Sequence, residues 1–144
     1  AARQRVARLL AQSLAEELAM AWEGLDDKPD VHPVRGPETG LVMVRGRIGG
    51  GGDPFNLGEA TITRATVRLG SGTVGHAYAL GTDKAKVRLA AIFDAMWQED
   101  QTSGFVENEI LSPIESRIAD EDQRRASQTA ATRVDFFTMV RGDD

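Results

Sequence analysis

The stretch from residue 39 to residue 80 is the feature that most limits the folds open to this chain. Three runs rich in Val, Ile, Thr and Tyr lie there, at residues 41–48, 59–69 and 73–80. Such residues suit a pleated, half-buried surface. Glycine clusters at residues 49–52 and 70–72 separate the runs, and glycine supplies the positive φ angles of tight turns but is too free to continue a strand. The pattern predicts a three-stranded antiparallel meander.

A turn at residues 70–72 fixes how the second and third strands pair. The pairs on one face are then small and apolar: Leu69 with Thr73, Val67 with Gly75, and Ala65 with Ala77. The other face is apolar at one end and basic at the other: Ile62 with Leu80, Arg64 with Tyr78, Thr66 with His76, and Arg68 with Val74. A slip of one residue would exchange the partners, so this register is a hypothesis.

Helical periodicity appears on both sides of the predicted sheet. Residues 1–25 are predicted to form one helix, because apolar residues recur at spacings of three and four: Val6, Leu10, Leu14, Leu18, Ala21 and Leu25. A second helix should begin at a Thr82 or Asp83 cap and end near Gln98. We expect four of its residues to be buried against the small face of the sheet: Leu89, Ile92, Phe93 and Met96.

The last third of the chain is predicted to be a helical arm. Residues 102–104 should break the chain, and Ser112, Pro113 and Glu115 match a capping box that starts a new helix. That helix should run to about residue 132 with a mostly polar surface, so it should lie outside the core. The fold class is therefore α+β, a helix-covered three-stranded meander. Residues 1–111 form its body, and residues 112–144 form an arm and tail of the same domain.

An apolar tail follows the polar helix, and two interpretations of it remain open. Either residues 134–142 fold back as a strand on the sheet, or they dock on another subunit, since apolar patches mark interaction sites. The candidate interface residues are Phe136, Phe137, Met139, Val140 and Arg141.

Composition excludes several kinds of chemistry. The 144 residues include no cysteine, so disulfides, thiolate catalysis and Cys-ligated metals are excluded. His32 and His76 are the only histidines, which excludes a multi-His metal site within one chain. The net charge of −5 argues against nucleic-acid binding, and no apolar run is long enough to span a membrane. Glu16 and Glu17 interrupt any secretion signal, and a cytoplasmic location is expected.

Charge is unevenly distributed, and this points to the candidate anion-binding residues. Residues 33–81 carry five arginines against three acids, whereas residues 98–132 carry three arginines against eight acids. Arginine matches phosphate oxygens with a two-pronged donor, so the candidates are Arg64, Arg68, His76, Arg45 and Arg47. The alternative is a solvated sheet face. The glycine run at residues 49–52 lacks the Lys and Ser/Thr of a phosphate loop and fits a hairpin turn better.

Three segments together resemble a known family. They are GLVMVRGRIGGGGDPFNLGEATITRATVRL at residues 40–69, GTVGHAYALGTDKAKVRLAAIFDAM at residues 72–96, and RVDFFTMVRGD at residues 133–143. They resemble the G subunit of bacterial carbon–phosphorus lyase, the PhnG family. The terminal segment is the most specific part of the likeness, and the glycine-rich hairpin the least.

The resemblance implies a role in phosphonate degradation. Members of the family assemble with H, I and J subunits, two copies of each, and act with the L subunit. The assembly supports transfer of the ribose 5-triphosphate of ATP to a phosphonate, with release of adenine. The resemblance supplies no catalytic residue, and we expect no cofactor on this chain, ATP being a substrate of the complex. Three hypotheses stay open: a subunit that contributes residues to a shared site, a non-catalytic scaffold that stabilises the I subunit, and an independent nucleotide-binding module.

Overall fold

The computed structural model describes the backbone of residues 1–47 and 54–142, and the side chains of residues 1–44 and 58–130. The elements are, in chain order, α1 (Ala2–Ala11), α2 (Ala15–Glu23), β1 (Val31–Arg47), β2 (Pro54–Leu69), β3 (Val74–Leu80), α3 (Lys84–Trp97), α4 (Asp100–Val106), the π-helical turn η1 (Glu107–Leu111) and α5 (Ser112–Gly142). The α+β class is confirmed.

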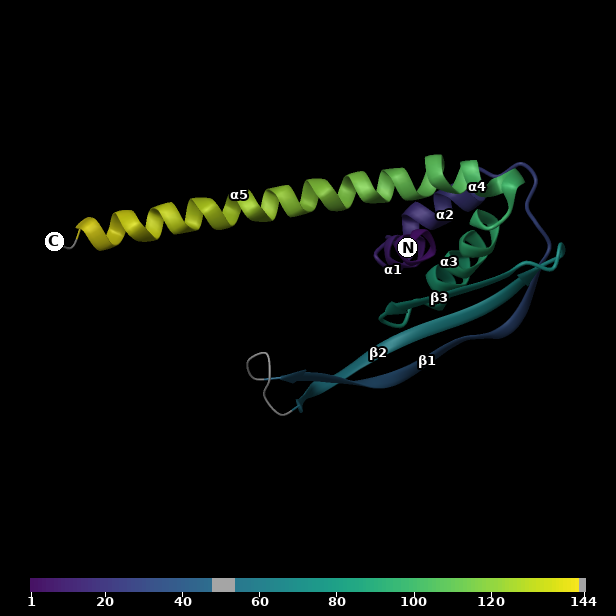
Figure 1. Ribbon diagram of the computed structural model, residues 1–144, viewed down its shortest axis with the longest axis horizontal. Helices are drawn as coiled ribbons and strands as arrows, with labels where there is room; N and C mark the ends of the chain where they lie inside the picture. Colours follow the sequence, from purple (N-terminus) through teal and green to yellow (C-terminus); the bar gives the residue numbers. More distant parts are fainter. Residues whose placement is uncertain (48–53, 143–144) are drawn as a thin grey trace.

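The helices cover one face of the sheet and leave the other bare (Figure 1). Helix α3 contacts all three strands, and α1 lies beside it against β3. Helix α2 and turn η1 pack on the far side of α3 and α1. Helix α5 then projects well beyond the body, and the paired ends of β1 and β2 extend past β3 on the same side (Figure 1).

The sheet has the predicted topology, with strand order β1-β2-β3 and antiparallel pairing throughout. The predicted register of β2 and β3 is confirmed, including Arg64 opposite Tyr78 and Val67 opposite Gly75. The predicted start of the first strand is wrong, because β1 begins at Val31 rather than residue 41. The pairing of β1 with β2 is irregular between Pro33 and Glu38, where Gly36 has φ +69°. The turn at residues 49–52 lies outside the described residues.

Helix α3 approaches the sheet closely because small residues meet there. A Cβ atom on Gly75 would lie 2.7 Å from the Ala95 amide nitrogen and closer still to the Ala91 carbonyl oxygen. The predicted burial of Ile92, Phe93 and Met96 is confirmed, but Leu89 is only half-buried. The prediction that Phe93 packs against the small face of the sheet is wrong. Phe93 packs edge-to-face on Trp22 of α2, 6.3 Å between ring centroids, while alanines meet the strand.

The N-terminal segment forms two helices, so the prediction of one helix over residues 1–25 is wrong. The chain turns at Ser13 and Leu14, where the Ser13 hydroxyl donates to the Leu10 carbonyl and Glu17 accepts from the Leu14 amide at 2.7 Å. This local hydrogen bonding competes with helix continuation. The break buries Leu18 and leaves Leu14 44% exposed, outside the predicted apolar stripe.

The chain stays helical from Asp100 to Gly142, so three predictions about this part are wrong. Residues 102–104 lie inside α4 rather than breaking the chain, and Ser112 has helical angles, φ −61° and ψ −46°, rather than those of a cap. The five-residue turn η1 precedes Pro113. Proline lacks an amide donor and clashes with the carbonyl four residues earlier, and the wider π turn accommodates both effects. The predicted helix end near residue 132 is also wrong, because α5 continues to Gly142, and this excludes the strand, one of the two interpretations left open for residues 134–142.

Replacement of Gly75 by alanine should destabilise the fold by about 1–3 kcal/mol, as overpacked cores do. The new methyl group would force α3 away from β3. Chemical denaturation measures the effect, and Gly104→Ala is the matched control. No atom lies within 4 Å of a Cβ at Gly104, inside α4, so that variant should gain about 0.5–1 kcal/mol. Equal stability of Gly75→Ala and the wild type would contradict the close approach.

Candidate functional site

The predicted basic face lies on the bare side of the sheet. Arg64 of β2 is opposite Glu38 of β1, and its Nε donates to Glu38 Oε1 at 2.8 Å. Arg35 Nε lies 3.9 Å from the same oxygen. The prediction treated the arginines as open to an anion. The structure instead pairs one of them, Arg64, with a carboxylate, so a phosphate group at Arg64 would have to compete with Glu38.

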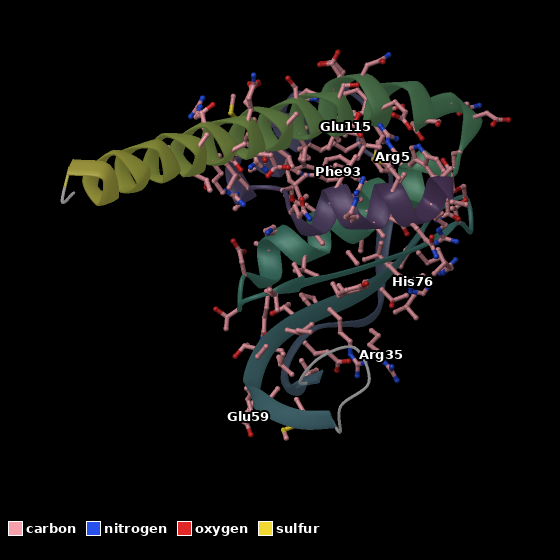
Figure 2. All side chains as sticks on the ribbon, turned by 60° about the vertical axis from the view of Figure 1, so that its left-hand side comes forward. Arg5, Arg35, Glu59, His76, Phe93 and Glu115 are labelled. Atoms are coloured by element: carbon pink, nitrogen blue, oxygen red, sulfur yellow. The ribbon has the colours of Figure 1, made fainter. Side chains whose placement is uncertain are left out.

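His76 and Arg68 differ from Arg64 in their surroundings. The His76 ring nitrogen Nδ1 lies 3.0 Å from the Thr66 hydroxyl, on the same face as Arg64. The Arg68 side chain is exposed and has no hydrogen bond or ion pair with any described residue. A groove of about 750 Å³ runs along this face, lined among others by Arg35, Arg64, His76 and Tyr78. Figure 2 shows Arg35 and His76 projecting from the strands, away from the helices.

Other predicted site residues fall where side chains are not described. Arg45 and Arg47 belong to β1, near the far end of its pairing with β2. The five candidate interface residues of the tail belong to the last turns of α5: Phe136, Phe137, Met139, Val140 and Arg141. Their side chains, like those of Arg45 and Arg47, lie outside the described residues.

Asp94 is a buried charge that the sequence prediction missed. It lies on the sheet side of α3 and is only 2% exposed. Its Oδ2 accepts the His76 backbone N–H at 2.9 Å and Arg3 Nη2 at 3.2 Å. A lone carboxylate between Phe93 and Ala95, inside an apolar helix, was the available signal. Its partners make it a structural group, because it caps an open position on the edge of β3.

Two arginine clusters fix the root of the α5 arm. Arg5 of α1 donates to Glu107 at 3.1 Å and to Glu115 at 3.2 Å, and the Trp97 indole donates to Glu107 at 2.9 Å. Figure 2 shows Arg5 and Glu115 meeting between α1 and α5. The Trp97 hydrogen bond, followed by Arg5, lowers the pKa of Glu107. The hydrogen bond that Arg5 donates to Glu115, followed by the one that it donates to Glu107, raises the pKa of Arg5.

Arg117 forms the second cluster, on the other side of the arm. It donates to Glu17 of α2 at 3.0 Å, to the Gln12 carbonyl at 2.8 Å and to Glu121 at 3.0 Å. The hydrogen bond to Glu17 is the main reason why its pKa is raised. Because the two clusters hold different sides of α5, they set the direction in which the arm leaves the body.

Beyond this root the described side chains of the arm lie outside the core. Ile114 is fully buried, but every side chain from Ala119 to Ala130 is exposed except the half-buried Glu121. The 31 residues of α5 span about 46 Å at 1.5 Å per residue. The predicted polar helix outside the core is confirmed.

Within the described residues, no group of three or more His, Asp or Glu side chains could hold a metal ion. Among the same residues, no helix is both long and apolar enough to cross a membrane. The arrangement offers exposed cations, a bare sheet face and a projecting helix. These are the features of a protein that binds others through its surface.

Comparison with known proteins identifies the family. The model of the family described as phosphonate metabolism protein PhnG matches residues 1–142, so the chain belongs to this family. A protein of Rhizobium meliloti (strain 1021) is 62% identical over 144 residues, which cover all of this chain and 92% of that protein. It is named alpha-D-ribose 1-methylphosphonate 5-triphosphate synthase subunit PhnG. The resemblance seen in the sequence is confirmed.

Replacement of Glu107 by glutamine should remove a pH-dependent part of the stability. The folded-state pKa of Glu107 lies below its ordinary value, so its stabilisation is present above the unfolded-state pKa and is lost as the pH falls through the folded-state pKa. We expect the variant to be about 1 kcal/mol less stable at pH 7, and the gap to close toward pH 3. Thermal unfolding at several pH values measures it. A gap that is constant with pH would contradict the ion pair with Arg5.

Proposed function

We propose that this chain is the G-type subunit of an α-D-ribose 1-methylphosphonate 5-triphosphate synthase in phosphonate degradation. The observation that carries the proposal is the 62% identity, over the whole chain, to a subunit of that synthase. The complex would transfer the ribose 5-triphosphate of ATP to a phosphonate and release adenine. ATP is a substrate of the assembly, this chain binds no cofactor of its own, and the complex works in the cytoplasm.

The chain's own role in that complex is to hold other subunits rather than to carry out chemistry. Glu38 engages Arg64, which leaves the most central cation of the sheet face partly neutralised. The His76 ring lies within hydrogen-bond distance of the Thr66 hydroxyl, and no described carboxylate orients the ring as a paired acid would in an acid–base site. Both observations favour the scaffold over a subunit that contributes residues to a shared site, and over an independent nucleotide-binding module.

The companion subunits in this proposal are the H, I and J subunits of the core complex, together with the L subunit. The I subunit is the direct partner of the α5 arm. Two arginines, Arg5 and Arg117, each hydrogen-bonded to glutamates of more than one element, hold the arm at its root, and its last turns carry large apolar residues. A rigid helix with an apolar end is a common way to reach into a groove on a partner.

Reconstitution distinguishes the scaffold from the shared site. Omission of this chain from the purified subunits should abolish adenine release, because the assembly does not form. Arg64→Ala and Arg68→Ala, added at saturating concentration, should restore kcat and KM to within about twofold of the wild type. A drop of more than tenfold in kcat/KM, with assembly intact by gel filtration, would place either arginine in a shared site. Full activity without the chain would refute the proposed function.

Deletion of residues 134–144 should leave a folded domain that no longer binds the I subunit tightly. The exposed arm makes no contribution to the described core beyond Ile118, so circular dichroism should show an unfolding midpoint close to that of the wild type. Co-purification with the I subunit should fall by at least tenfold. Retained tight binding would mean that the arm's end is not an anchor, and loss of folding would mean that it packs on the body.

A further inference from the structure

The bare face of the sheet is unusually apolar at one end. An antiparallel sheet with one wet face normally alternates apolar residues inward with polar residues outward. On this face the outward residues of β3 include Tyr78, opposite Arg64, and Leu80, opposite Ile62. Their side chains are 63% and 74% exposed. Val42 and Val44 continue this surface on β1, at 40% and 39% exposed, with Ile62 of β2 between the strands. Four of the exposed large apolar side chains that the structure describes thus lie on this face, whereas Leu41 and Met43 of β1 alternate with Val42 and Val44 and point to the other face.

The opposite end of the same face is basic. Arg68 follows Arg64 along β2, four residues further from Ile62, so both cations lie on the outward side with His76 next to them. Arg64 is held by Glu38, whereas Arg68 has no partner among the described side chains. The face is therefore an apolar patch with a free cation at one end. The groove lined by Arg35, Val42 and Tyr78 crosses the region between them.

We propose that this outward face is a docking surface for a companion subunit of the synthase. The surface consists of Val42, Val44, Ile62, Tyr78 and Leu80, with Arg68 at its basic end. The occupant is a protein surface with apolar side chains placed beside carboxylates, such as an acidic amphipathic helix laid across the strands. This inference rests on the proposed function and adds a second contact to the α5 arm.

Charge complementarity decides in favour of a companion subunit over a second copy of this chain. A second copy could cover the face with the exposed part of α5. Two of the three carboxylates of that segment are engaged, Glu121 with Arg117 at 3.0 Å and Asp122 with Arg125 at 3.9 Å, which leaves Asp120 as its one carboxylate without an ion pair to a described side chain. Arg124 adds a further positive charge beside them. This helix thus has few carboxylates that could pair with Arg68, whereas a companion subunit could place a carboxylate beside it and form an ion pair.

The experiment measures binding of the full chain to the purified companion subunits by biolayer interferometry. Leu80→Glu should lower the affinity at least tenfold, because it places a charge in the centre of a desolvated patch. Met20→Glu is the matched control, since Met20 is 75% exposed on α2, on the helical side of the molecule. Arg68→Glu should lower the association rate several-fold, with Arg88→Glu, exposed on α3, as its control. Thermal unfolding confirms that each variant is folded.

Wild-type affinity in Leu80→Glu overturns the docking surface, and equal losses in Leu80→Glu and Met20→Glu overturn it too. Light scattering tests the second copy. A wild-type dimer that Leu80→Glu converts to monomer, with unchanged affinity for the companion subunits, would assign the face to a second copy and overturn the proposal. A wild-type chain that binds none of the companion subunits would instead refute the proposed function itself.

Discussion

The close approach of α3 to β3 is the contact on which the rest of the structure depends. It is possible because Gly75 has no side chain and because Ala91 and Ala95 are the helix residues that meet it. At this short separation, Asp94 reaches the His76 amide and Gln98 reaches the Val74 carbonyl. Asp94 of α3 and Gln98, which caps its C-terminal end, thus satisfy two backbone groups on the free edge of β3, where an open edge would invite pairing with other chains. The bulky side of α3 is left free to hold α2 and the root of the arm.

The sheet could be predicted because its register depends on residues that are close together in the sequence. Side chains alternate with a period of two, and a short glycine turn at residues 70–72 leaves one register that groups Ala65, Val67 and Gly75 on a single face. The Asp83 cap was readable for the same reason, because its side chain accepts from the Lys86 amide within one turn. Such features depend on neighbours in sequence, and a sequence displays those directly.

The helix boundaries were predicted wrongly at two places, near Ser112 and at Ser13, where one local signal favours a helix end and another favours continuation. Ser112 and Pro113 form a good helix start in isolation, but here they follow a helix that is already running, and the π turn η1 accommodates the proline. Which outcome wins depends on Ile110, Leu111 and Ile114, all buried in the shared core. Burial of these three residues in the core favours a continuous helix over a new helix start at Ser112. The break at Ser13 is the reverse case, in which a short-range hydrogen bond interrupted a pattern that looked continuous.

The candidate site shows the same limit more sharply. That Arg64 lies on the outward face followed from alternation, but its neutralisation by Glu38 did not. The two residues are 26 positions apart, and irregular pairing in β1 sets which residue lies opposite. Asp94 could be suspected from its place in an apolar helix, but its partners Arg3 and His76 come from distant parts of the chain. The likeness to a phosphonate-metabolism family therefore carried the function, because the charges alone did not identify a ligand.

Buried and exposed residues are separated in this chain, which has a packed core on one side of the sheet and exposed surfaces elsewhere. Its core is complete on one side of the sheet, where Phe93, Leu18 and Ile114 are almost wholly buried and no described buried polar side-chain atom lacks a hydrogen-bond partner. The arm beyond Ile118 and the outward sheet face add length and apolar area without adding to that core. Binding that covers these surfaces would stabilise the folded chain by mass action without changing its interior. Substitutions on these exposed surfaces would leave the contact between Gly75 and α3, and with it the body, intact.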